Sequence, residues 1–175
     1  MTQSYPDTLR LSRKVLSLLI KLNVLMGIFI LTLLIASLVA EDFLMRALGA
    51  HHPNSDNAIF VTAVRVIMVI GILSVPLAHV VLTRLQDIVE TVKVGDPFVA
   101  VNAARLQTIA WAVLGLEMMH LVVGAVAAIA SSEDHPLDLD WNFSVTRWLA
   151  VLLLFVLARV FDQGTRMREE LDGTV

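Results

Sequence analysis

Residues 22–40, LNVLMGIFILTLLIASLVA, form a run of 19 residues without a charged side chain. A helix needs about 20 such residues to cross the roughly 30 Å hydrocarbon core of a bilayer. Three later runs approach this length and contain few charges. The predicted membrane spans are residues 16–40, 58–82, 109–130 and 143–161.

The composition agrees with a chain that lies mainly in lipid. Of its 175 residues, 57% are hydrophobic and 17% are charged, whereas soluble domains have roughly half apolar and about a quarter charged residues. Backbone polar groups in lipid must be satisfied within each segment, and the runs are too long and too uniformly apolar for barrel strands. We therefore expect one all-α domain over residues 1–175, an integral membrane four-helix bundle.

The sequence argues against several functional classes. It has no cysteine, which excludes disulfides, thiolate metal sites and a cysteine nucleophile. It contains no Gly-rich phosphate loop and no two-histidine metal motif. His79 and His120 differ by roughly 10 Å in predicted depth, which argues against a bis-histidine haem. We expect no enzyme activity, cofactor or metal, and the net charge of -3 without a basic recognition helix argues against direct nucleic-acid binding.

The positions of Lys and Arg predict the orientation, because these residues concentrate on the cytoplasmic side. The N-terminal arm, the middle loop and the tail hold ten of the thirteen. We therefore expect both termini and the middle loop in the cytoplasm, with a retained first span rather than a cleaved signal peptide, whose apolar core is only about 7–15 residues. The ten residues are Arg10, Arg13, Lys14, Lys21, Arg84, Lys93, Arg105, Arg159, Arg166 and Arg168.

The two predicted outer loops, about 41–57 and 131–142, are rich in acids and histidines. Carboxylates and imidazoles are plausible ligands of a divalent cation. No pair has a recognised ligand spacing, so ordinary solvated loops are the preferred interpretation. The residues are Glu41, Asp42, His51, His52, Asp56, Glu133, Asp134, His135, Asp138 and Asp140.

Both cytoplasmic segments predict amphipathic helices beyond the bilayer. Apolar residues recur at helical spacing from Leu82 to Val92, and again after Phe161. Gly95 then marks a helix end, and the pair Asp96-Pro97 marks the start of the next helix. These extensions form either a cap on the bundle or a docking surface for a cytoplasmic protein. The candidate surface residues are Gly95, Asp96, Pro97, Phe98, Asn102, Arg105, Arg166 and Arg168.

Arg65, Glu117 and His120 are ionisable and lie away from the ends of predicted spans, where charges are costly and often functional. Glu117 and His120 are three residues apart and share a helix face. An axial gap of about 12 Å separates Arg65 from Glu117. A polar clasp between helices, an Arg65 that reaches outward to the membrane surface, and a proton or ligand site all remain open.

Four glycines and one proline within the spans are expected to affect how the helices pack. Gly27, Gly71, Gly115 and Gly124 are expected to be points of close contact between helices. Pro76 removes one backbone hydrogen bond and predicts a kink in the second span.

The cytoplasmic segments resemble a known family. The pattern comprises Gly95-Asp96-Pro97-Phe98, Asn102, Arg105-Leu106 and Ile109, then Leu157-Ala158-Arg159-Val160-Phe161, Gly164, Met167-Arg168, Glu170-Leu171 and Gly173-Thr174-Val175. It is similar to bacterial membrane proteins grouped as domain of unknown function 2975 (DUF2975), over nearly the whole chain. The resemblance implies four spans in the bacterial inner membrane and a small cytoplasmic helix-turn-helix regulator as partner. It implies no catalytic residue.

Three functional hypotheses follow. The first is a membrane-tethered regulatory or scaffold protein that acts through its cytoplasmic face. The second is a small transporter or proton-coupled channel, which must form a homo-oligomer because four spans leave little room for a pathway. The third is a membrane sensor of a ligand, lipid or cation.

Overall fold

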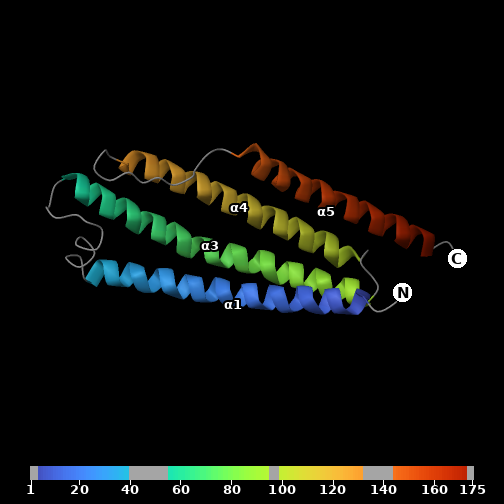
Figure 1. The fold of residues 1–175 in the computed structure, drawn as a ribbon. Helices are drawn as coiled ribbons and strands as arrows, with labels where there is room; N and C mark the ends of the chain where they lie inside the picture. Colours follow the sequence, from blue (N-terminus) through green and yellow to red (C-terminus); the bar gives the residue numbers. More distant parts are fainter. Residues whose placement is uncertain (1–3, 40–54, 95–98, 132–143, 173–175) are drawn as a thin grey trace. The chain divides into compact units, whose positions relative to one another are not determined.

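The computed structural model describes residues 4–39, 55–94, 99–131 and 144–172, and nearly all of them are helical (Figure 1). Helix α1 comprises Ser4–Val39 and α3 comprises Ser55–Val94. Helix α4 comprises Ala100–Ala130 and α5 comprises Val145–Asp172. No β-strand occurs in these ranges. The all-α prediction is therefore confirmed for the described residues.

The helices continue beyond the predicted spans. At about 1.5 Å per residue, the 36 residues of α1 and the 40 of α3 extend about 54 and 60 Å. Helix α3 passes through Pro76 to Val94, and α5 reaches Asp172. Both predicted helical extensions are therefore confirmed, while residues 95–98, which contain the predicted helix stop and start, lie outside the described residues.

Three helices are long and apolar enough to cross a membrane: Leu11–Val39, Ile59–Lys93 and Ala100–Ala130. Among the described residues, α5 is not one of them. Its uninterrupted apolar run, residues 148–158, has 11 residues, which extend only about 17 Å as a helix. A fourth crossing over residues 143–161 therefore remains a prediction.

The chain forms two compact units. The first unit comprises Met1–Asn23, Leu77–Gly115 and Ser144–Val175, and the second comprises Val24–Pro76 and Leu116–Phe143. Helices α1, α3 and α4 contribute to both, whereas α5 belongs wholly to the first. The first unit has eleven of the thirteen Lys and Arg residues and eight of the sixteen acids, which gives a formal charge of +3. The second unit has two Lys or Arg residues and eight acids, which gives a formal charge of -6. The charge segregation in the sequence thus follows the structural division.

Three of the predicted glycine contacts are present within these units. A Cβ on Gly27 of α1 would lie 3.1 Å from both methyl groups of Val75 on α3. A Cβ on Gly71 would lie 3.6 Å from the nearest atom of Ile30, and one on Gly115 would lie 3.1 Å from Leu77. The missing side chains therefore allow neighbouring helices to approach closely.

Much of the surface is apolar. Large hydrophobic side chains of α1, including Leu18, Leu25 and Leu38, are exposed along its length. Soluble monomers rarely expose contiguous apolar patches larger than a few hundred Å². Such a surface requires lipid or another apolar surface to cover it.

Candidate functional site

A polar cluster joins the end of α3 to the start of α4 in the first unit; we call Asp87, Thr91, Asn102 and Arg105 the α3–α4 clasp. Asn102 Nδ2 donates to Thr91 Oγ1 at 2.7 Å, and Asn102 Oδ1 accepts from Arg105 Nη1 at 3.0 Å. The same Arg105 nitrogen donates to the Asp87 carbonyl oxygen at 3.2 Å. Arg105 Nε lies 3.7 Å from Asp87 Oδ2. The clasp therefore connects two helices through side chains.

Asn102 is the centre of this clasp, and 0% of its surface is exposed. A buried amide is costly unless it is hydrogen-bonded, and here both ends of the amide have partners. Asn102 and Arg105 are three residues apart, so they share the face of α4 that packs against α3. The sequence pattern predicted both residues as part of a partner surface. In the structure, their side chains hold α3 against α4.

The sequence did not identify Thr91 or Asp87 as polar partners of the α4 residues. Thr91 also donates its hydroxyl to the Ile88 carbonyl oxygen at 2.7 Å, which leaves its oxygen to accept from Asn102. Asn102 and Arg105 lie on an otherwise apolar face of α4, and buried polar side chains need polar partners. The sequence therefore indicated that such partners exist, but it did not identify them.

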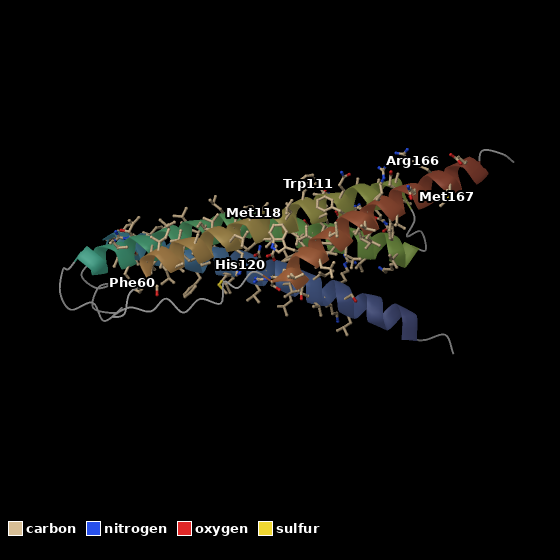
Figure 2. All side chains as sticks on the ribbon, turned by 90° about the horizontal axis from the view of Figure 1, so that it is seen from above. Phe60, Trp111, Met118, His120, Arg166 and Met167 are labelled. Carbon is tan, nitrogen blue, oxygen red and sulfur yellow. The ribbon has the colours of Figure 1, made fainter. Side chains whose placement is uncertain are left out.

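A groove of about 450 Å³ lies between the first turns of α4 and the middle turns of α5; we call it the α4–α5 groove. Four alanines supply much of its wall, and small side chains let another backbone approach closely. The helices lie side by side here, and Arg166 is labelled on α5 in Figure 2. The lining residues are Ala100, Ala103, Ala104, Gln107, Phe155, Ala158, Arg159, Asp162 and Arg166.

The groove carries a surplus of positive charge. Asp162 Oδ2 lies 3.8 Å from Arg159 Nη1 and 3.3 Å from Arg166 Nη2. The arginine side chains are 74% and 71% exposed, so these pairs contribute little to stability. One carboxylate does not neutralise two guanidinium groups, and the rim therefore suits an anionic group of a partner.

An aromatic pair fixes α5 beside the first half of α4. The rings of Trp111 and Phe155 meet edge to face, with centroids 5.1 Å apart and an interplanar angle of 83°. This arrangement is favourable for aromatic rings. Phe155 also lines the groove, so the contact helps to set the position of its α5 wall.

Other members of the predicted partner surface are not described. Residues Gly95, Asp96, Pro97 and Phe98 lie outside the described residues, as does the side chain of Arg168. Of the predicted surface residues, the structure therefore brings Arg166 into the groove, and it places Asn102 and Arg105 in the clasp.

In the second unit, Arg65 of α3 caps the C-terminal end of α1. Arg65 Nε donates to Ser37 Oγ at 2.9 Å, and Arg65 Nη2 donates to the Ser37 carbonyl oxygen at 2.6 Å. Helix α1 ends at Val39, and the last four carbonyls of a helix have no partner within it. A cation there also interacts favourably with the helix dipole. Sequence reasoning considered Glu117 or the membrane surface for Arg65 and missed Ser37.

Glu117 and His120 both lie on the part of α4 that belongs to the second unit (Figure 2 labels His120). Both are partly buried. Among the described residues, His120 Nε2 is buried without a hydrogen-bond partner. An unsatisfied buried polar atom costs about 1–3 kcal/mol. This nitrogen is therefore a candidate position for a proton or a ligand.

The part of the chain that the structure describes contains no group of three or more His, Cys, Asp or Glu residues able to hold a metal ion. The acids and histidines of the predicted outer loops lie outside the side chains that are described. A cation site in those loops is therefore untested.

The described residues form four long helices, three of which have the length and composition of membrane spans, so this part of the chain is an all-helical protein with extensive apolar surfaces. The chain belongs to the DUF2975 family, described as a protein of unknown function, whose family model matches residues 24–175. No curated protein and no solved structure matches it. The family resemblance in the sequence is therefore confirmed.

Proposed function

We propose that this chain is a non-enzymatic integral membrane protein of the bacterial inner membrane that acts as a membrane-tethered regulator or scaffold. Three helices of spanning length and the exposed apolar surface support membrane insertion. The α4–α5 groove is the observation that carries the regulatory part. The partner is a small cytoplasmic helix-turn-helix regulator, the class that the family resemblance implies.

In this proposal, both termini and the segment that connects α3 to α4 lie in the cytoplasm. Ten of the eleven Lys and Arg residues of the first unit, all except Arg147, support this side, because positive residues are retained there. Placing both termini on one side requires α5 to cross, and its 28 residues extend about 42 Å. Three crossings would instead place the termini on opposite sides.

Single cysteines test this topology, because the natural chain has none. Ser12→Cys reports on α1, Gln163→Cys on α5, and Ser131→Cys on the residue that follows α4. A membrane-impermeant maleimide should label Ser131→Cys in intact spheroplasts, and the other two only after permeabilisation. Labelling of Gln163→Cys but not Ser12→Cys before permeabilisation would show that α5 does not cross.

The groove favours a helical partner that carries an acid and small residues. A helix can lay one face into a groove between two other helices, and alanine walls allow it to come close. The surplus charge of Arg159 and Arg166 over Asp162 then attracts a carboxylate on that helix. Because both arginines are exposed, this attraction governs partner selection and association rate more than affinity.

Copurification from detergent tests the docking. Ala104→Leu fills the groove and should reduce the copurified regulator about fivefold or more, the effect of losing one good interface contact. Ala128→Leu is the matched control, an exposed alanine of α4 outside the groove. Arg166→Gln should weaken binding more than Arg84→Gln, which alters an exposed arginine outside the groove.

Two results contradict the docking proposal. One is a wild-type chain that recovers no helix-turn-helix regulator, together with unchanged transcription of its own operon after deletion of the gene. The other is an equal loss of regulator in Ala128→Leu and Ala104→Leu, which would assign the effect to general instability.

A second candidate is a small oligomeric transporter or proton-coupled channel, favoured by the unpaired buried nitrogen of His120 beside Glu117. Glu117→Gln should abolish proton flux into proteoliposomes while leaving regulator binding intact. Absence of flux through the wild-type chain excludes this function. A sensor of a ligand, lipid or cation would combine either site with the docking groove.

A further inference from the structure

A second hollow, of about 410 Å³, lies between α1 and the last turns of α3; we call it the α1–α3 hollow. All its residues belong to the first unit, and it is separate from the α4–α5 groove. The family match begins at residue 24, so it does not include the α1 side of this hollow. The lining residues are Arg13, Lys14, Ser17, Gln86, Val89, Glu90 and Lys93.

The α1–α3 hollow has three basic side chains and one carboxylate. Glu90 Oε2 lies 3.7 Å from Arg13 Nη1, and Glu90 Oε1 lies 3.5 Å from Lys93 Nζ. Within the described residues, Lys14 has no ion-pair partner. The hollow therefore keeps a positive charge that Glu90 does not neutralise.

Two neutral donors line the same hollow. Ser17 and Gln86 are partly buried, and in the described ranges neither side chain has a hydrogen-bond partner. An ammonium, a guanidinium, a hydroxyl and an amide are all donors to phosphate oxygens. This donor set suits a compact anion with several acceptor oxygens, such as a phosphate group.

An apolar face of α1 lies beside these donors. Leu11, Val15, Leu18 and Leu22 are exposed and recur at i, i+4, i+7 and i+11, which places them on one side of the helix. Lys14 precedes Leu18 by four residues and is therefore its neighbour on the helix surface. A ligand with a phosphate in the hollow can lay hydrocarbon along this face, and such a ligand is a phospholipid.

We propose that the α1–α3 hollow binds the headgroup phosphate of an anionic phospholipid. Lys14, Ser17 and Gln86 contact the phosphate oxygens, and Arg13 and Lys93 supply further positive charge. The acyl chains lie along the apolar face of α1. This inference rests on the proposed membrane insertion but not on the regulator.

The test uses the full chain in vesicles of phosphatidylcholine with a minority of phosphatidylglycerol. After mild detergent extraction, native mass spectrometry counts the lipids that stay bound. The wild-type chain should retain phosphatidylglycerol in preference to phosphatidylcholine. Lys14→Gln should reduce that preference about fivefold, the change expected for one basic residue near a membrane surface.

Two further variants make the result specific to the hollow. Glu90→Gln should increase the preference, because Arg13 and Lys93 then lose their competing carboxylate. Lys21→Gln is the matched control: it removes the same charge about two helical turns further along α1, outside the hollow. It should leave the preference unchanged.

Each alternative has its own outcome. An equal loss in Lys21→Gln and Lys14→Gln, or no preference in the wild type, overturns the site. Displacement of the lipid by millimolar inorganic phosphate identifies a free anion as ligand and overturns the lipid assignment. A chain that fails to float with phosphatidylcholine vesicles refutes membrane insertion itself, whereas a chain that floats without lipid preference refutes only the hollow.

Discussion

Replacing Asn102 with alanine removes the centre of the α3–α4 clasp and should lower the free energy of unfolding by about 2.5 kcal/mol. It deletes the bonds to Thr91 Oγ1 at 2.7 Å and from Arg105 Nη1 at 3.0 Å. A neutral hydrogen bond contributes about 1 kcal/mol and one with a charged donor about 1.5–3 kcal/mol. The lower part of this range applies, because Arg105 keeps the Asp87 carbonyl and its side chain is 21% exposed.

A double-mutant cycle isolates the bond between the helices. Thr91→Val alone should lower the free energy of unfolding by about 1 kcal/mol. The double variant should lose about 1 kcal/mol less than the sum of the two single losses, because both substitutions remove the same bond. Thr108→Val is the matched control: its hydroxyl is exposed and donates only to Ala104 of its own helix at 2.8 Å. This variant should change the stability by less than about 0.5 kcal/mol.

The assay is reversible unfolding of the full chain in mixed micelles with increasing dodecyl sulfate, followed by circular dichroism. Additive effects of Asn102→Ala and Thr91→Val would show that the two side chains do not interact. A loss in Thr108→Val as large as that in Thr91→Val would assign the effect to helix propensity. Either result would refute the clasp as a stabilising link between α3 and α4.

Two further predictions concern the second unit and use the same unfolding assay. Gly27→Val should destabilise the protein by about 1–3 kcal/mol through overpacking, and Val75→Ala should relieve part of this loss. Gly71→Ala has ordinary space for its new methyl group and should be neutral or stabilising by up to about 1 kcal/mol. Equal effects at both glycines would contradict the contact geometry. Ser37→Ala should cost about 1 kcal/mol by removing the hydroxyl that accepts from Arg65 Nε, and an unchanged stability would show that the carbonyl bond alone holds the guanidinium.

Local sequence patterns predicted several features correctly. Residues 22–39 of the first apolar run and the periodic extensions after Leu82 and Phe161 lie in helices, because apolar spacing and backbone hydrogen bonding are decided within a few turns. The glycine contacts were predictable for a similar reason, since a glycine in an apolar helix often marks a close approach. Helix α5 is the exception. Its extension was foreseen, but its membership of the first unit was not.

The sequence by itself determined the helices, their apolar surfaces, the separation of charge and the family. Only the tertiary structure decided that Asn102 bonds to Thr91, that Arg65 caps α1 through Ser37, and that Arg159 and Arg166 line a groove with Asp162. Helix formation depends on local periodicity, whereas a partner on another helix depends on how each helix is rotated and shifted against its neighbour. Packing of many side chains at once fixes that rotation and shift, and no short stretch of sequence specifies them.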